Sequence, residues 1–194
     1  MLFQDRTYAV LIVSSSDKFC EALRMQLPGS DYWPIDIATN ASAARRILLD
    51  REFDLILINT PLKDEFGTQF AIDVCSKTSA SVLLFVKSEL VDEVCVKSME
   101  YGVASIPKPT SASVISQSLL ILRAQRERLL RTEEKQHSIE EQIADMRLIN
   151  RAKWLLIEKK GMSESEAHRY IEKQAMDERI TMREDAQRVF CMLE

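Results

Sequence analysis

The chain has 194 residues, of which 46% are hydrophobic and 29% charged, with only 4 glycines and 5 prolines. This composition is typical of globular proteins and excludes a fibrous or largely disordered chain. The formal net charge of −4 excludes a broad basic field that would draw the whole molecule to nucleic acid or to an anionic membrane.

Features of membrane, secreted and metal-binding proteins are also missing from the sequence. The longest uncharged apolar runs, Tyr8–Val13 and Leu55–Ile58, have the length of strands and fall far below the roughly 20 residues that span a bilayer. The 4 cysteines stand singly and the 2 histidines lie far apart, so the sequence predicts neither a disulfide framework nor a zinc site. No apolar signal segment follows the first residues. We therefore expect a cytoplasmic protein that uses no metal or other cofactor and does not enter a membrane.

Short apolar runs alternate with amphipathic segments up to about residue 110. The expected strands are Ala9–Val13, Ile35–Ala38, Asp54–Asn59, Val82–Val86 and Ala104–Ile106, and the expected helices lie near Asp17–Leu27, Ala41–Arg51, Gly67–Ser76 and Leu90–Tyr101. Wholly apolar strands suit a parallel sheet that is covered on both faces. The strict alternation predicts a doubly wound α/β domain of five strands, with its functional edge at the carboxyl ends of the strands.

A long helix is predicted next, because residues 111–160 contain no proline or glycine and Gly161 then supplies a stop signal. A loose spacing of three and four residues along it resembles the seam of a coiled coil. The seam residues are Leu122, Gln125, Leu129, Thr132, Gln136, Ile139, Ile143 and Met146. We expect this helix to pair with a second copy of the chain, weakly or in one register because several seam residues are polar. The alternative is a solvated helix that links two domains.

The C-terminal segment contains two capping boxes, Ser163 with Glu166 and Thr181 with Glu184, and each is expected to open a helix. Together with the end of the long helix they predict a three-helix core of roughly 50 residues, close to the lower size limit for independent stability. The expected core residues are Ile149, Ala152, Leu155, Leu156, Ala167, Tyr170, Ile171, Ala175, Ala186, Val189 and Phe190.

The α/β half resembles the receiver domain of bacterial response regulators over about residues 7–122. The resemblance rests on the strand positions, the block Phe53–Asn59 and the pair Lys108-Pro109. Receivers have an acidic pair after the first strand, the phosphoacceptor aspartate after the third, a Thr or Ser after the fourth, and a lysine before proline after the fifth. The matching residues in this sequence are Ser14 and Ser15, Asn59, Val86 and Lys108.

These substitutions remove the chemistry of phosphoryl transfer. A carboxylate is the nucleophile in that reaction, whereas the Asn59 amide is neutral. Mg²⁺ prefers anionic oxygen ligands, and Ser14 and Ser15 are neutral. Asp17 could supply charge nearby, or it could be an ordinary helix N-cap. We predict a pseudo-receiver, in which Lys108 is either a surface lysine or a structural partner at the strand ends.

A different phosphoacceptor is the alternative for this domain. Asp54 and Asp64 are the two candidates. Asp54 is the weaker of them, because it begins its predicted strand and lies far from the carboxyl end.

The C-terminal segment, about residues 139–194, resembles an ANTAR domain, the module of transcription antitermination regulators of the amidase- and nitrate-regulator type. The matching stretches are 149–157, 160–167, 170–171 and 174–179. A receiver, a long helix and an ANTAR domain in this order is a known family arrangement, so we expect domains at residues 1–122, 111–146 and 139–194. The resemblance implies a regulator, not an enzyme, that binds paired hairpins of a leader transcript and so prevents a terminator from forming.

Five basic residues are candidates for RNA contacts. Arg169 and Lys173 share one face of their helix, Arg151 and Lys153 flank Ala152, and Arg179 lies at a helix end. The alternative is that they form ordinary ion pairs on helix surfaces, for example between Lys173 and Asp177.

Trp154 departs from the family, which usually has glycine at this position. Its indole could stack on an RNA base, but packing against a neighbouring helix is the interpretation we favour. A rival function for the whole chain is a protein-interaction scaffold or decoy whose ANTAR segment no longer binds RNA. A regulatory protein that masks the ANTAR module is an expected further partner.

Overall fold

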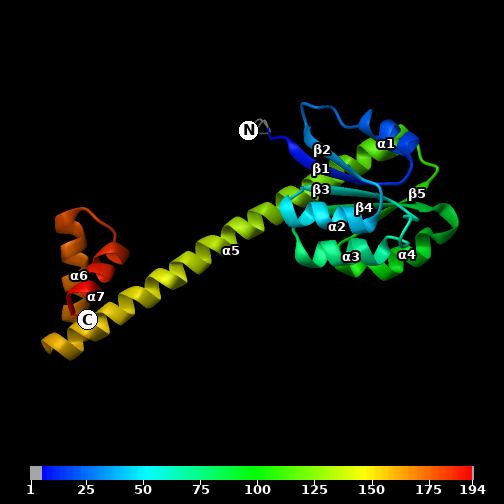
Figure 1. Cartoon of the computed structure of the whole chain (residues 1–194). Helices are drawn as coiled ribbons and strands as arrows, with labels where there is room; N and C mark the ends of the chain where they lie inside the picture. The colour runs from blue at the N-terminus through cyan, green and yellow to red at the C-terminus, as the bar shows by residue number, and fades with distance from the viewer. Residues whose placement is uncertain (1–5, 194) are drawn as a thin grey trace. The chain divides into compact units, whose positions relative to one another are not determined.

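The computed structural model describes residues 6–193, so the predicted domain limits at residues 1 and 194 lie outside the described residues. The chain forms two compact units, one ending at Arg131 and the other beginning at Thr132. A single helix, α5 (Ala112–Lys160), runs through this boundary (Figure 1). The predicted long helix is therefore confirmed, and Gly161 follows it with a φ of 66°.

The first unit is a five-stranded parallel sheet in the order β2-β1-β3-β4-β5. Its strands are β1 (Tyr8–Val13), β2 (Tyr32–Ala38), β3 (Leu55–Asn59), β4 (Ser81–Lys87) and β5 (Ala104–Lys108). Its helices are α1 (Asp17–Arg24), α2 (Ala41–Asp50), α3 (Thr68–Lys77), α4 (Val91–Ser98) and the first part of α5, with short 3₁₀ turns at Ser88–Leu90 and Met99–Tyr101. The predicted α/β fold is confirmed.

Two hydrophobic cores lie on the two faces of this sheet. Leu55 and Leu57 of β3 join α1 and α5 in one core, whereas Ile56 and Ile58 join α2, α3 and α4 in the other. All four side chains have 0% exposure. Successive strand residues point to opposite faces, so a continuous apolar run is what a doubly covered strand requires.

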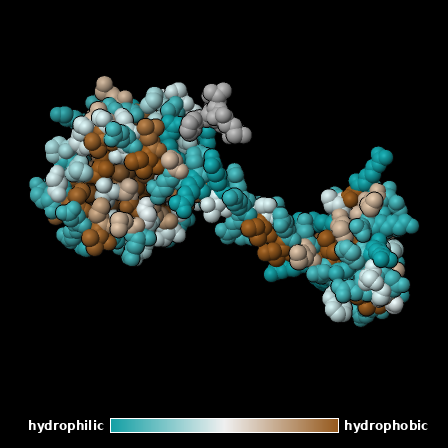
Figure 2. Space-filling view, turned by 180° about the vertical axis from the view of Figure 1, so that it is seen from behind, coloured by the Kyte–Doolittle hydropathy of each residue, from teal (hydrophilic) through white to brown (hydrophobic). Residues whose placement is uncertain are grey.

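The first turns of α5 belong to the first unit and not to a coiled-coil seam. Leu122 is fully buried in the core beneath α5, and the Gln125 side-chain amide donates a hydrogen bond to the Gly102 carbonyl oxygen at 3.3 Å. The prediction that these two residues belong to the seam is therefore wrong. The apolar seam residues further along α5 are exposed, and Figure 2 shows hydrophobic side chains on this helix outside either core.

The second unit consists of the end of α5, α6 (Glu164–Glu178) and α7 (Met182–Leu193). Both predicted capping boxes form. The Ser163 backbone N–H donates to Glu166 Oε2 at 2.8 Å and the Glu166 N–H donates back to Ser163 Oγ at 3.3 Å. Thr181 and Glu184 make the same pair of bonds at 2.8 and 3.2 Å.

A small hydrophobic core holds these three helices together. Its buried residues are Ala152, Leu156, Ala167, Ile171, Ala186 and Val189. Ile149, Tyr170 and Phe190 pack against it as expected, whereas Leu155 is only half-buried and lies outside this cluster. No helix in residues 6–193 is long and apolar enough to cross a bilayer.

Candidate nucleic-acid interface and receiver pocket

Three of the predicted pocket residues are joined by hydrogen bonds at the carboxyl ends of β1, β3 and β5. Lys108 Nζ donates to Asn59 Oδ1 at 2.6 Å and also to the Thr60 carbonyl oxygen. Asn59 Nδ2 donates to Ser14 Oγ at 3.0 Å. We call this set the Ser14–Asn59–Lys108 chain. Asn59 is therefore a satisfied polar group that faces Lys108.

Lys108 is a structural partner at the strand ends rather than a surface-loop lysine. Its side chain is half-buried, and its pKa is lowered by burial and by the nearby charge of Lys87. Its acceptors are an amide oxygen and a carbonyl oxygen. An ammonium group held by neutral oxygens offers no nucleophile for phosphoryl transfer.

The side chains of the other predicted pocket residues form no hydrogen bond with those of Ser14, Asn59 or Lys108 within residues 6–193. Val86 has 0% exposure and lies in the hydrophobic core. Ser15 and Asp17 are exposed, and neither makes a hydrogen bond to Ser14, Asn59 or Lys108 in the part of the chain described. The N-cap of α1 is Ser16, whose Oγ accepts from the Phe19 N–H, so the interpretation of Asp17 as the cap is wrong.

Both alternative phosphoacceptors have structural partners. Asp54 accepts hydrogen bonds from Arg6, from Arg126 and from the Ala9 N–H at 2.9–3.0 Å. The exposed Asp64 accepts from the backbone N–H groups of Ala41 and Ser42 at the start of α2 at 3.0 and 2.9 Å. These bonds favour the carboxylate of Asp64 and lower its pKa from 3.8 to about 2.

The Asp64 carboxylate gives a prediction for pH dependence. Because its pKa is lower in the folded state, Asp64 stabilises the first unit above pH 4 and loses this contribution as the pH falls toward its folded pKa of about 2. We expect Asp64→Asn to have a lower free energy of unfolding than wild type in urea at pH 7. This difference in free energy should disappear as the pH falls from 4 to 2. The exposed Glu52→Gln serves as the control. A difference that stays constant across this range would contradict the assignment.

The two basic residues best supported by the sequence motif make contacts between helices of the second unit. The Lys153 ammonium pairs with Glu164 at 3.2 Å, and its side chain is only 15% exposed. The Arg151 guanidinium lies 4.7 Å from the centre of the Phe190 ring. Lys153 therefore connects α5 to α6, and Arg151 connects α5 to α7.

The basic residues of α6 lie on its outer face. Arg169 and Lys173 are exposed, whereas Ala167, Ile171 and Ala175 on the opposite side of the helix are buried. Neither cation forms an ion pair within residues 6–193, so the alternative of paired surface charges is wrong for both.

Two more candidates for RNA contacts, Arg179 and Trp154, lie on the surface of the second unit. Arg179 is the C-cap of α6, with a φ of 55° and an exposed side chain. Trp154 is 69% exposed, so the interpretation that it packs against a neighbouring helix is wrong. An aromatic ring open to solvent beside basic residues offers a stacking surface for bases.

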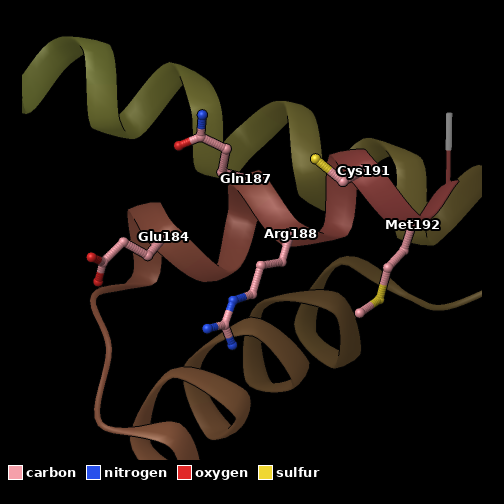
Figure 3. A pocket seen from close by; sticks show the side chains of 5 residues that line it. All are labelled: Glu184, Gln187, Arg188, Cys191 and Met192. Carbon is pink, nitrogen blue, oxygen red and sulfur yellow. The ribbon is translucent and has the colours of Figure 1, made fainter.

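A shallow groove on α7 is a separate surface feature. Figure 3 shows Gln187 and Cys191 on one side of the helix and Arg188 and Met192 on the other. Arg188 pairs with Glu178 of α6. All of the lining residues come from α7, so this groove is part of the helix surface and includes none of the predicted RNA contacts. Within residues 6–193 no cluster of three or more acidic, His or Cys side chains could hold a metal ion.

Known proteins resemble this chain in both units. Residues 137–189 match the ANTAR domain family. The chain is 27% identical over 138 residues to the transcriptional regulatory protein PdtaR of Mycobacterium tuberculosis, and the alignment covers 69% of this chain and 65% of that protein, slightly less than two thirds of it.

Solved structures match the α/β fold. A CheY-like receiver domain protein from Methanospirillum hungatei aligns with a TM-score of 0.55 and 20% identity, over 63% of this chain and 99% of its own. The receiver domain of an HD domain-containing protein from Pseudomonas fluorescens aligns with a TM-score of 0.57 and 22% identity. This alignment covers 69% of this chain and 97% of the Pseudomonas domain. The comparisons support the resemblances stated from the sequence: residues 137–189 match the ANTAR domain family, and the first unit shares the α/β fold of these receiver domains.

Proposed function

We propose that this chain is an RNA-binding transcription antitermination regulator whose ANTAR module binds paired hairpins in leader transcripts. The observation that carries the proposal is the outer face of α6, where Arg169 and Lys173 are exposed and form no ion pair within residues 6–193. RNA hairpins present phosphates and unstacked loop bases, which basic and aromatic side chains recognise. The match of residues 137–189 to the ANTAR family supports the same function.

The basic residues divide into contact and positioning roles in this proposal. Arg169, Lys173 and Arg179 contact phosphates or bases, and Trp154 stacks on a loop base. Arg151, which is exposed and lies against the Phe190 ring, is a further candidate contact. Lys153 is mainly a positioning residue, because its ammonium already pairs with Glu164 and its side chain is largely buried.

Neutralising the outer face of α6 tests the RNA contacts. We expect Arg169→Ala/Lys173→Ala to weaken binding to a two-hairpin leader at least tenfold, and to make its salt dependence shallower by about one to two units of slope. Filter binding over a range of salt concentrations measures both. Arg24→Ala/Lys77→Ala removes the same charge from exposed positions of the first unit and is the control. Wild-type protein that binds the leader no better than scrambled RNA at moderate salt would end the RNA proposal.

The first unit acts in this proposal as a pseudo-receiver without the usual phosphorylation. The Ser14–Asn59–Lys108 chain supports this role, because an amide occupies the place of the phosphoacceptor and already accepts a hydrogen bond from Lys108. Control of the protein would then come from a protein partner that masks the ANTAR module, or from its abundance in the cytoplasm.

Acetyl phosphate tests the pseudo-receiver. We expect no acid-labile phosphoryl label on the purified protein after incubation with acetyl phosphate and Mg²⁺, in conditions that label a receiver with an intact aspartate. A stoichiometric label on the wild-type chain would overturn this part of the proposal. Its loss in Asp64→Asn would identify Asp64 as the acceptor.

The scaffold or decoy remains the second candidate function. It is supported by the engagement of Lys153 and Arg151 in contacts within the second unit, which leaves fewer cations available for RNA. A pull-down from RNase-treated lysate separates the two functions, because a protein partner survives the treatment and an RNA-tethered one does not.

A further inference from the structure

Asp185 is a buried carboxylate in the small core of the second unit. It lies in the first part of α7, directly before Ala186, and is only 5% exposed. Its Oδ2 atom is buried and has no hydrogen-bond partner in residues 6–193. A buried polar group without a partner destabilises the packing around it, and a charged group does so more strongly. Asp185 therefore opposes the docking of the helix that carries it.

The charged groups that contact α7 from the neighbouring helices are engaged with other residues of α7. On α5, Asp145 pairs with Arg183 at 2.7 Å and the Arg151 guanidinium lies against the Phe190 ring. On α6, Glu178 pairs with Arg188. On α7 itself, the Glu184 carboxylate accepts hydrogen bonds from Thr181. None of these contacts relieves the burial of Asp185, and burial is the cause that raises its pKa.

The packing of α7 against the core is correspondingly weak. Besides Asp185, its buried residues are Ala186 and Val189, so the apolar area that it buries is small. Both of its ion pairs to other helices are exposed, and such pairs contribute little to stability. By comparison, α6 buries three apolar residues and no charged one, namely Ala167, Ile171 and Ala175.

The contacts between α6 and α5 do not depend on α7. Lys153 of α5 pairs with Glu164 of α6, and the Lys160 ammonium lies 5.0 Å from the centre of the Tyr170 ring. The capping box at the start of α6 involves only Ser163 and Glu166. These contacts can persist when α7 leaves the core.

We propose that α7 undocks reversibly from α5 and α6 while these two helices stay in contact, and that the charge on Asp185 favours the undocked form. Regions that bury few apolar side chains are the ones that open locally at low free energy. Undocking uncovers the apolar side of α5 and α6, including Leu156 and Ile171. The proposal requires no RNA, so its test and the test of RNA binding can fail independently.

Native-state hydrogen exchange on the full-length chain, without RNA at pH 7, tests the proposal. In wild type we expect the central amides of α7 to be at least tenfold less protected than those of α6. Asp185→Val, which replaces the carboxylate with an apolar side chain, should raise the protection of α7 about tenfold. Asp185→Asn, which removes only the charge, should raise it by a smaller factor. Asp177→Asn, at an exposed position of α6, is the matched control and should leave α7 unchanged.

Three results would overturn the proposal. The first is equal protection of α6 and α7 in wild type. The second is a protection of α7 that does not rise in the two variants of Asp185, or that rises as much in Asp177→Asn. The third is a rise that is equal in α6 and α7, because Asp185 would then destabilise the second unit as a whole and not the docking of α7.

The pH dependence of exchange tests the role of the charge. Because burial raises the pKa of Asp185 above its usual 3.8 in the docked form, its unfavourable effect is present at pH 7 and fades as the pH falls through the raised pKa. The difference in α7 protection factor between wild type and Asp185→Asn should therefore narrow from pH 7 to pH 4. The pKa of Glu184 is lowered by its bonds to Thr181, and this contribution is the same in both proteins. If the difference is as large at pH 4 as at pH 7, the charge on Asp185 does not favour undocking and the proposal fails.

Discussion

Replacing Arg126 with alanine is expected to lower the free energy of unfolding of the first unit by about 3 kcal/mol. Arg126 Nε donates to Asp54 Oδ1 at 3.0 Å and Nη1 donates to the Ser79 carbonyl oxygen at 2.9 Å. The side chains of Arg126 and Asp54 are only 10% and 11% exposed. Without Arg126, the Asp54 carboxylate stays largely buried with Arg6 as its remaining cation, and the Ser79 oxygen loses this donor. Urea unfolding followed by circular dichroism measures the loss.

The exposed Arg131→Ala, five residues further along α5, is the control and should change stability by less than about 0.5 kcal/mol. A double-mutant cycle with Asp54→Ala separates the ion pair from the bond to Ser79. If Arg126→Ala lowers the free energy of unfolding by less than 1 kcal/mol, the Arg126–Asp54 pair does not hold α5 to the sheet.

Leu156→Ala should unfold much of the second unit while leaving the first unit intact. Leu156 has 0% exposure and lies at the centre of the three-helix core. Truncating a buried leucine costs about 2–5 kcal/mol, which is comparable with the whole stability of so small a core. We expect amide protection in α6 and α7 to be lost in hydrogen exchange. The hairpin binding that we propose for this unit should be lost with it.

Leu155→Ala is the matched control for this experiment. Leu155 is the adjacent residue of α5, but it is half-buried and outside the core cluster. The same side-chain truncation should therefore cost about 1 kcal/mol or less and leave α6 and α7 protected. Equal effects of the two substitutions would mean that the core does not lie where the structure has it. Loss of protection in β3 with Leu156→Ala would mean that the two units do not unfold separately.

The sequence predicts the secondary structure well where the local signals are strong. The run Leu55–Ile58 identifies β3, and the capping boxes identify the first turns of α6 and α7. The sequence predicts the start of β2 too late, because the exposed Trp33 and the half-buried Pro34 interrupt the apolar pattern. Since β2 is an edge strand of the sheet, it tolerates a proline that a central strand would not.

Contacts between distant residues could not be predicted from periodicity. Arg126 and Asp54 are 72 residues apart, and nothing in the spacing of either identifies its partner. Leu122 fits the seam spacing as well as Leu129 does, and only the position of the sheet decides that Leu122 is buried. The exposure of Trp154 was missed for the same reason, since the arrangement of α6 and α7 decides which side of α5 they cover.

The Ser14–Asn59–Lys108 chain also affects the electrostatics of the fold. Carboxylates gathered at one edge of a sheet repel one another, and this repulsion penalises folding unless bound cations or protons relieve it. Here a hydroxyl, an amide and one ammonium group meet instead, so no such repulsion arises among them. This edge of the first unit therefore keeps the same internal bonding whether divalent ions are scarce or abundant, and throughout the mildly acidic range.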